Sequence, residues 1–126
     1  MLLAVNGTLM RGLPLNRNML AAGAAFIAEA RTAQAYRLWS IRDAYPGMLR
    51  SSQAGAAIWL ELWEVTAGGL VQILDQEPAG LTLGRVALSD GREVLGVLVE
   101  PYAVEAQREI TSFGGWRAYL ASQGLA

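Results

Sequence analysis

The stretch between Asn6 and Asn16 reads Asn-Gly-Thr-Leu-Met-Arg-Gly-Leu-Pro-Leu-Asn, and it separates two different secondary-structure patterns. The apolar residues 1–5 before it predict a buried strand, and residues 15–22 after it have the spacing of a short helix. Backbone N–H groups at a turn from strand to helix lack partners within either element and suit a carboxylate or another anion. We therefore expect an anion-binding turn here; the alternative is a connection that binds nothing.

The amino-acid composition excludes several kinds of chemistry. The chain has 126 residues, 53% of them hydrophobic, a net charge of −1, and neither cysteine nor histidine. Thiol nucleophiles, Ser-His arrangements and the common zinc sites are therefore excluded, and the absence of lysine excludes Schiff-base chemistry. A near-neutral chain also lacks the basic surface that nucleic-acid binding needs. Acid–base chemistry is left to carboxylates, tyrosines or water, and we expect neither a cofactor nor a metal.

The organisation of the chain predicts one domain, residues 1–126, without linkers or repeats. No apolar run approaches the ~18 residues of a membrane-spanning helix. Residues 1–5 are too short for the apolar part of a signal peptide and lack a basic flank. We therefore expect a cytoplasmic protein that does not bind membranes.

Apolar spacing predicts an irregular order of strands and helices along the rest of the chain. The predicted strands are 2–5, 25–31, 35–41, 58–65, 83–88 and 94–100; the predicted helices are 15–22, 68–75, 105–111 and a last one after Gly114-Gly115. Residues 43–47 are predicted as a loop because Pro46 and Gly47 favour a turn. This order differs from a regular βαβ alternation and predicts an α+β domain, a small mixed β-barrel with a few flanking helices.

A single carboxylate stands out on the predicted strand 58–65. Alternation places Trp59, Glu61 and Trp63 on one face of that strand. Two flanking tryptophans would desolvate Glu61 and raise its pKa, which would suit a role in binding substrate. The alternative is an ordinary solvated glutamate between two aromatic residues.

Two segments resemble motifs of gamma-glutamyl cyclotransferase-like proteins. Gly7–Gly12 is similar to their Tyr-Gly-Thr-Leu-(Lys/Arg)-Arg-Gly loop, and Gly69–Glu77 is similar to their Leu-Asp-x-x-Glu-Gly helix end. In that family the loop amides hold the substrate and the glutamate is the general acid/base. The resemblance therefore implies that Glu77 is the general acid/base, or Asp75 if the register shifts.

This chain departs from the cyclotransferase motifs at three positions. Asn6 replaces the tyrosine, the spacing from Asp75 to Glu77 is one residue shorter, and Pro78 replaces the glycine. The shorter spacing and the proline would both change the direction of the Glu77 side chain. The alternative for Glu77 is a solvated loop position.

Further segments along most of the chain resemble the C-terminal domain of allophanate hydrolase, which has the cyclotransferase-like fold. They are Gly12–Asn16, Tyr36–Leu38, Pro46–Arg50, Gly80–Gly84, Asp90–Arg92 and Ile110–Leu120. In that domain a histidine of the opening loop is thought to assist loss of carbon dioxide from a carboxylated intermediate. The corresponding position is Leu9 here, so a histidine-dependent decarboxylation is excluded.

The first function that the resemblance implies is binding, with or without processing, of a small carboxylated amide or urea-derived molecule. The chain would act as a stand-alone relative of the domain, beside a separate amidase, with its pocket next to Gly7–Met10. Arg37 or Arg50 would hold a carboxylate, because bidentate arginine contacts are strong and directional. The expected substrate-binding residues are Asn6, Gly7, Thr8, Leu9, Met10, Asn16, Arg37, Arg50 and Glu61.

Two other functions stay open at this point. The chain could be a gamma-glutamyl cyclotransferase that releases 5-oxoproline, provided that burial raises the pKa of Glu77 toward neutrality. It could instead be a non-catalytic binding or assembly module, in which Ala103–Ala126 forms an interface such as that of a homodimer. In that segment Trp116 and Tyr119 suit either an interface or a core.

Overall fold

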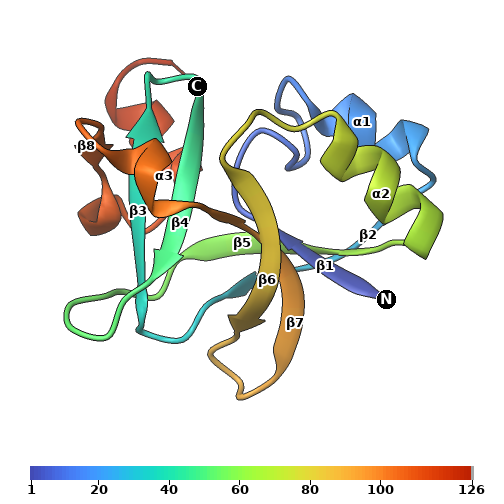
Figure 1. Ribbon diagram of the computed structural model, residues 1–126, viewed down its shortest axis with the longest axis horizontal. Helices are drawn as coiled ribbons and strands as arrows, with labels where there is room; N and C mark the ends of the chain where they lie inside the picture. Colours follow the sequence, from blue (N-terminus) through green and yellow to red (C-terminus); the bar gives the residue numbers. More distant parts are fainter. Residues whose placement is uncertain (126) are drawn as a thin grey trace.

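The computed structural model describes residues 1–125 and has an α+β architecture (Figure 1). The strands are β1 (Leu2–Val5), β2 (Ala25–Arg31), β3 (Tyr36–Ile41), β4 (Tyr45–Arg50), β5 (Trp59–Glu64), β6 (Leu81–Ala87), β7 (Glu93–Val99) and β8 (Arg108–Glu109). The helices are α1 (Asn16–Ala21), α2 (Ala67–Asp75) and α3 (Trp116–Ser122), with 3-10 turns at Pro101–Val104 and Thr111–Phe113. Ala126, the last residue of the predicted domain 1–126 and of the predicted interface Ala103–Ala126, lies outside the described residues.

The strands form two sheets. A five-stranded sheet has the order β2-β5-β1-β7-β6, in which β1 is parallel to β7 and the other neighbours are antiparallel. A three-stranded antiparallel sheet has the order β4-β3-β8. The α+β class and the mixed sheet are as predicted, whereas the strands do not close into a barrel.

The large sheet does not close into a barrel because its edge strands β2 and β6 scarcely pair with each other. A single antiparallel bridge joins Thr32 to Leu88, where a barrel would need pairing along both strands. Thr32 is buried, and its hydroxyl accepts the N–H of Ile58 at 2.9 Å while the chain leaves β2 for the second sheet. The departure of β3 and β4 into that sheet therefore leaves β2 and β6 as edges.

The helices lie at opposite ends of the molecule. Figure 1 shows α1 and α2 side by side against the large sheet, and α3 beside the sheet that contains β3 and β4. Trp116 and Tyr119 of α3 are buried, with 2% and 0% of their surface exposed. The apolar face predicted for the last helix therefore belongs to the core and is not available as an interface.

The predicted loop 43–47 is wrong in its second half, because β4 begins at Tyr45. The turn lies earlier, at Arg42 and Asp43, which both have positive φ. Pro46 is tolerated because β4 is an edge strand, and an edge strand can hold a residue that cannot donate to a ladder. Gly47 pairs with Trp39 of β3, and a Cβ at this position would lie 2.9 Å from Val99, so glycine allows β4 to pack closely against β7.

The predicted helix 105–111 is also wrong. This segment contains a turn at Ala106, whose φ is +60°, and then the short strand β8. Trp39 pairs with Glu109 across the sheet, and the N–H of the buried Ile110 donates to Leu38 O at 2.7 Å. Pairing with β3 therefore satisfies the backbone groups that a helix would have satisfied locally.

Candidate functional site

The opening loop leaves the end of β1, and two asparagine side chains hold it. Nδ2 of the buried Asn6 donates to Val97 O at 2.9 Å, which fixes the loop on β7. Nδ2 of Asn16 donates to Leu9 O at 2.8 Å, which ties the loop to the start of α1. Both predicted residues therefore position the loop with their side-chain amides.

Three consecutive backbone N–H groups of this loop are without a partner. In the hydrogen bonds of residues 1–125, the N–H groups of Gly7, Thr8 and Leu9 do not act as donors. The N–H of Met10, by contrast, closes a turn onto Gly7 O at 2.9 Å. Of the loop residues expected to bind a substrate through their N–H groups, Met10 is therefore excluded, because its N–H already donates to Gly7 O.

These three residues line a small cavity together with Glu77. The cavity holds about 20 Å³, which is room for about one water molecule. The loop forms one wall, and the segment after α2 brings Glu77 to it. The complete lining is Val5, Asn6, Gly7, Thr8, Leu9, Tyr45, Pro46, Glu77, Leu81 and Val97. We call this space the Glu77 cavity.

Glu77 reaches the cavity because α2 ends two residues before it, at Asp75. The helix starts at the N-cap Thr66, whose hydroxyl accepts the N–H of Gly69 at 3.0 Å. Burial raises the pKa of Glu77 to about 7, and no salt bridge or side-chain hydrogen bond within residues 1–125 involves its carboxyl group. Glu77 can therefore be protonated or ionised near neutral pH, which is the property of a general acid/base.

Tyr45 and Pro46 also line the cavity, although the sequence predicts a loop at these positions and no role in the site. Pro46 packs on Gly7 so closely that a Cβ at position 7 would lie 2.5 Å from its Cδ. Glycine at position 7 therefore allows the second sheet to cover the opening loop. The sequence feature that points to Pro46 is the resemblance of Pro46–Arg50 to the C-terminal domain of allophanate hydrolase, and this resemblance does not indicate a role for the residue.

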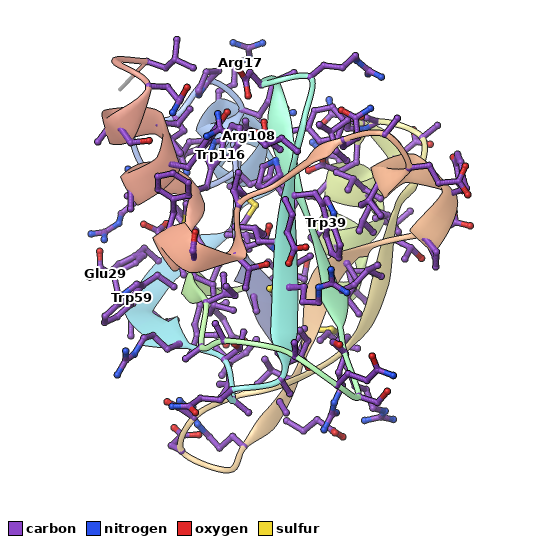
Figure 2. The ribbon with its side chains drawn as sticks, turned by 90° about the vertical axis from the view of Figure 1, so that its left-hand side faces the viewer. Arg17, Glu29, Trp39, Trp59, Arg108 and Trp116 are labelled. Atoms are coloured by element: carbon purple, nitrogen blue, oxygen red, sulfur yellow. The ribbon has the colours of Figure 1, made fainter. Side chains whose placement is uncertain are left out.

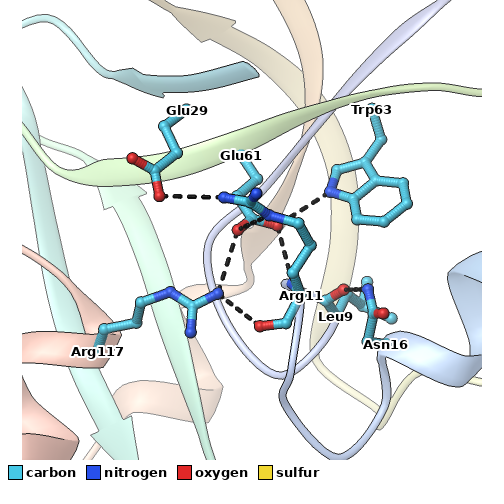
Figure 3. A network of polar contacts seen from close by, with 7 residues as sticks. All are labelled: Leu9, Arg11, Asn16, Glu29, Glu61, Trp63 and Arg117. Carbon is cyan, nitrogen blue, oxygen red and sulfur yellow. Dashed lines mark hydrogen bonds and ion pairs between the residues drawn. The ribbon is translucent and has the colours of Figure 1, made fainter. Parts of the chain in front are cut away.

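A second carboxylate, Glu61, lies beside Arg11 of the loop at the centre of a polar network (Figure 3). Its Oε1 accepts the N–H of Arg11 at 2.9 Å and the indole N–H of Trp63 at 3.1 Å. Its Oε2 accepts Nε of Arg11 and Nη2 of Arg117, both at 3.1 Å. Glu61 therefore fastens the opening loop, at Arg11, to β5 and α3.

The pKa of Glu61 is shifted in the direction opposite to the prediction. Burial disfavours its ionised form, since only 1% of the residue is exposed. The hydrogen bonds from Arg11, Trp63 and Arg117 outweigh burial and lower the pKa below its ordinary value. Both sequence-based alternatives for Glu61, a raised pKa and a solvated position, are therefore wrong. Its oxygens already have four donors, so a substrate group would have to displace one.

The other predicted site residues lie outside the Glu77 cavity. Arg37 forms a bidentate pair with Glu109, at 2.6 and 3.0 Å, on the second sheet. Arg50 is exposed beside the ring of Tyr36, and neither arginine lines this cavity. Asp75 is exposed and also absent from its lining. The structure thus brings Glu77 to the loop and leaves Asp75, Arg37 and Arg50 elsewhere.

Within residues 1–125, no group of three or more acidic side chains is arranged to hold a metal ion. In the same part of the chain, no helix combines the length and apolar character needed to cross a membrane.

Comparison with known sequences gives one matching family. The allophanate hydrolase C-terminal domain matches residues 1–121. Urea amidolyase of Saccharomyces cerevisiae is 29% identical over 94% of this chain, which corresponds to 7% of that protein. The chain therefore spans a small fraction of the length of this curated relative.

Comparison with solved structures gives the same architecture. The uropathogenic E. coli-specific protein c4763 has 52% sequence identity and a TM-score of 0.94, covering 95% of this chain and 94% of that one. Allophanate hydrolase of Kluyveromyces lactis has 26% identity and a TM-score of 0.92, covering 97% of this chain and 21% of that one. The fold class expected from the resemblance is therefore confirmed.

Proposed function

The chain belongs to the family of allophanate hydrolase C-terminal domains, and on this premise we propose that it binds a small carboxylated amide or urea-derived molecule in the Glu77 cavity. One observation carries the proposal: three unpartnered N–H groups and a carboxyl group with a pKa of about 7 line the same space. The N–H groups of Gly7, Thr8 and Leu9 suit the carboxylate of such a ligand.

Glu77 supplies the proton chemistry of this proposal. In its protonated form it donates a hydrogen bond to a ligand carboxylate or amide oxygen, and in its ionised form it accepts a proton from an amide nitrogen. A carboxyl group with a pKa near 7 exchanges between these forms at neutral pH. The absence of histidine leaves Glu77 as the group in this cavity best suited to proton transfer.

The size of the cavity limits the ligand. A volume of about 20 Å³ favours a small molecule, and its binding requires outward movement of the wall formed by Tyr45 and Pro46. A gamma-glutamyl amine is larger and would need a wider opening. The cyclotransferase hypothesis nevertheless stays open, because Glu77 lies beside the loop and has the pKa that a general acid/base needs.

The partner and the location stay predictions. S. cerevisiae urea amidolyase contains its matching region within a much longer chain. We therefore propose that this chain works with an amidase-type partner, in the cytoplasm.

Calorimetric titration with malonate, a diacid of the size of the proposed ligand, tests the binding function. We expect binding at pH 6 that weakens at pH 8, because ionised Glu77 repels the diacid. Glu77→Gln should remove this pH dependence. The matched control is Asp75→Asn, which removes one carboxylate at an exposed position near Glu77 and should behave as the wild type. Failure of malonate and other small diacids to bind at either pH would contradict the proposal.

The cyclotransferase hypothesis is tested separately by incubation with gamma-glutamyl amines. Release of 5-oxoproline that is lost in Glu77→Gln and kept in Asp75→Asn would support it. Absence of release across a panel of such amines would exclude it and leave the binding function intact.

A further inference from the structure

A larger cavity lies between β5 and the start of α3, and Met10 of the opening loop lines it. Its volume is about 230 Å³, compared with about 20 Å³ for the Glu77 cavity. Met10, Trp59, Leu60 and Trp116 give it mainly apolar walls. We call this space the β5–α3 cavity. It is large enough for a single aromatic ring with one polar substituent.

Each of the two carboxylates that line the β5–α3 cavity already has a guanidinium partner, and one of these partners, Arg11, lies outside the lining. The carboxylates of Glu29 and Glu61 lie with the guanidinium groups of Arg11 and Arg117 in one network (Figure 3). A ligand with a net charge would therefore have to compete with an existing ion pair. This arrangement favours an uncharged ligand.

Two polar groups of this network keep hydrogen-bonding capacity at the cavity. Arg117 uses only Nη2 in the contacts formed within residues 1–125, to Arg11 O at 2.6 Å and to Glu61 at 3.1 Å. Glu29 uses only Oε1, which accepts Nη2 of Arg11 at 3.1 Å. Both residues line the cavity and are exposed, so Arg117 offers donors there and Glu29 offers an acceptor.

The tryptophans of this cavity also suit a ligand. Trp59 is 51% exposed although it lies on a central strand of the large sheet. Trp116 is buried, and its Nε1 is the buried side-chain polar atom for which residues 1–125 provide no hydrogen-bond partner. Figure 2 shows Trp59 and Glu29 close together on one side of the molecule, whereas Trp39 lies on β3 away from them.

We propose that the β5–α3 cavity binds a small uncharged carboxamide with a planar apolar body. The amide oxygen accepts from the guanidinium of Arg117, and the amide nitrogen donates to the carboxylate of Glu29. The apolar body packs on the exposed ring of Trp59, in a cavity that Trp116 also lines. A carboxylate of the same shape has no N–H to donate to Glu29, and the negative charge of Glu29 repels it. This site is independent of the ligand proposed for the Glu77 cavity.

Titration with benzamide, followed by the indole N–H signals in a nitrogen–proton correlation spectrum, tests this proposal. We expect the signals of Trp59 and Trp116 to move and that of Trp39 to stay, with a dissociation constant on the order of 1 mM for so small a ligand. Benzoate is the matched control, and we expect it to bind at least ~10-fold more weakly because of its charge.

Two variants locate the site. Ala118→Trp fills the cavity from an exposed position and should weaken benzamide binding by at least ~10-fold. Glu77→Gln should bind benzamide as the wild type does, which separates this test from that of the proposed function. Unchanged binding in Ala118→Trp, benzoate binding as tight as benzamide, or movement of the Trp39 signal alone would overturn the proposal.

Discussion

Glu61 accepts hydrogen bonds from Arg11 of the opening loop and Glu77 lines a cavity with residues 7–9 of the same loop, and their surroundings shift their pKa values in opposite directions. Glu61 has four hydrogen-bond donors, two of them guanidinium groups, and its pKa is lowered in spite of burial. Glu77 has burial without a charged partner, and its pKa is raised to about 7. The comparison shows that burial alone does not identify a reactive carboxylate. The available partners decide whether it holds the fold together or exchanges protons.

The largest effect on stability is expected from removal of Glu61, the carboxylate that has partners. Glu61→Ala should lower the free energy of unfolding by about 2–4 kcal/mol, because it leaves Trp63 and two guanidinium groups without their acceptor. The loss should fall below that of a fully buried pair, since Arg11 and Arg117 are about half exposed and can turn to water. Denaturant unfolding measures the change.

Glu93→Ala is the control, because it removes an exposed strand glutamate. Its cost should stay within about 0.5 kcal/mol. Equal losses for the two variants would show that Glu61 does not fasten the loop.

A second variant disturbs the packing of Pro46 on the loop at the Glu77 cavity and changes no charge. Gly7→Ala places a methyl group 2.5 Å from Pro46 Cδ, so the ring and the loop must separate. We expect a loss of about 1–3 kcal/mol in the free energy of unfolding. The double variant Gly7→Ala with Pro46→Ala should recover most of it, which chemical denaturation can measure. Loss without recovery would locate the strain elsewhere.

The third prediction uses the opposite pKa shifts. The contribution of Glu77 to stability is complete below its ordinary pKa of 4.5 and is lost as the pH rises through about 7. The contribution of Glu61 is present above 4.5 and is lost as the pH falls through its lowered pKa. Glu77→Gln should therefore raise the free energy of unfolding at pH 8 by about 1–2 kcal/mol, a value reduced by partial solvent screening, and leave it unchanged at pH 4.

Unfolding curves of wild type and Glu77→Gln between pH 4 and 8 measure this difference. Asp75→Asn should give no such pH dependence. A Glu77→Gln variant that is equally destabilised at both pH values would mean that the carboxylate is needed for folding instead of being poised for proton transfer.

Much of the local structure could be predicted from sequence. The strand, the glycine-containing loop and the short helix α1 follow from apolar spacing and from Pro14 and Gly23 at the helix ends. The resemblance also named Glu77, and the structure places it beside the loop although its spacing is one residue short. The strand, the loop and the helix depend on residues that are close in the sequence, whereas the position of Glu77 beside the loop joins residues that are far apart in it.

Two segments were predicted incorrectly because tertiary pairing overrode local preference. Pro46 and Gly47 favour a turn, yet pairing with β3 and packing against Val99 make them part of β4. Residues 105–111 suit a helix, yet β3 offers them an edge, and β8 forms there. Local propensity is a weak signal where a neighbouring strand can satisfy the same backbone groups.

The α+β class, the position of the opening loop and the exclusion of histidine and cysteine chemistry follow from the amino-acid sequence alone. The difference in pKa between the two carboxylates follows from contacts between residues that are far apart in the chain. Arg11 and Arg117 are separated from Glu61 by 50 and 56 positions in the chain, so no local pattern could reveal that they lower its pKa. Glu77 keeps a raised pKa because the fold buries it without bringing it such a partner.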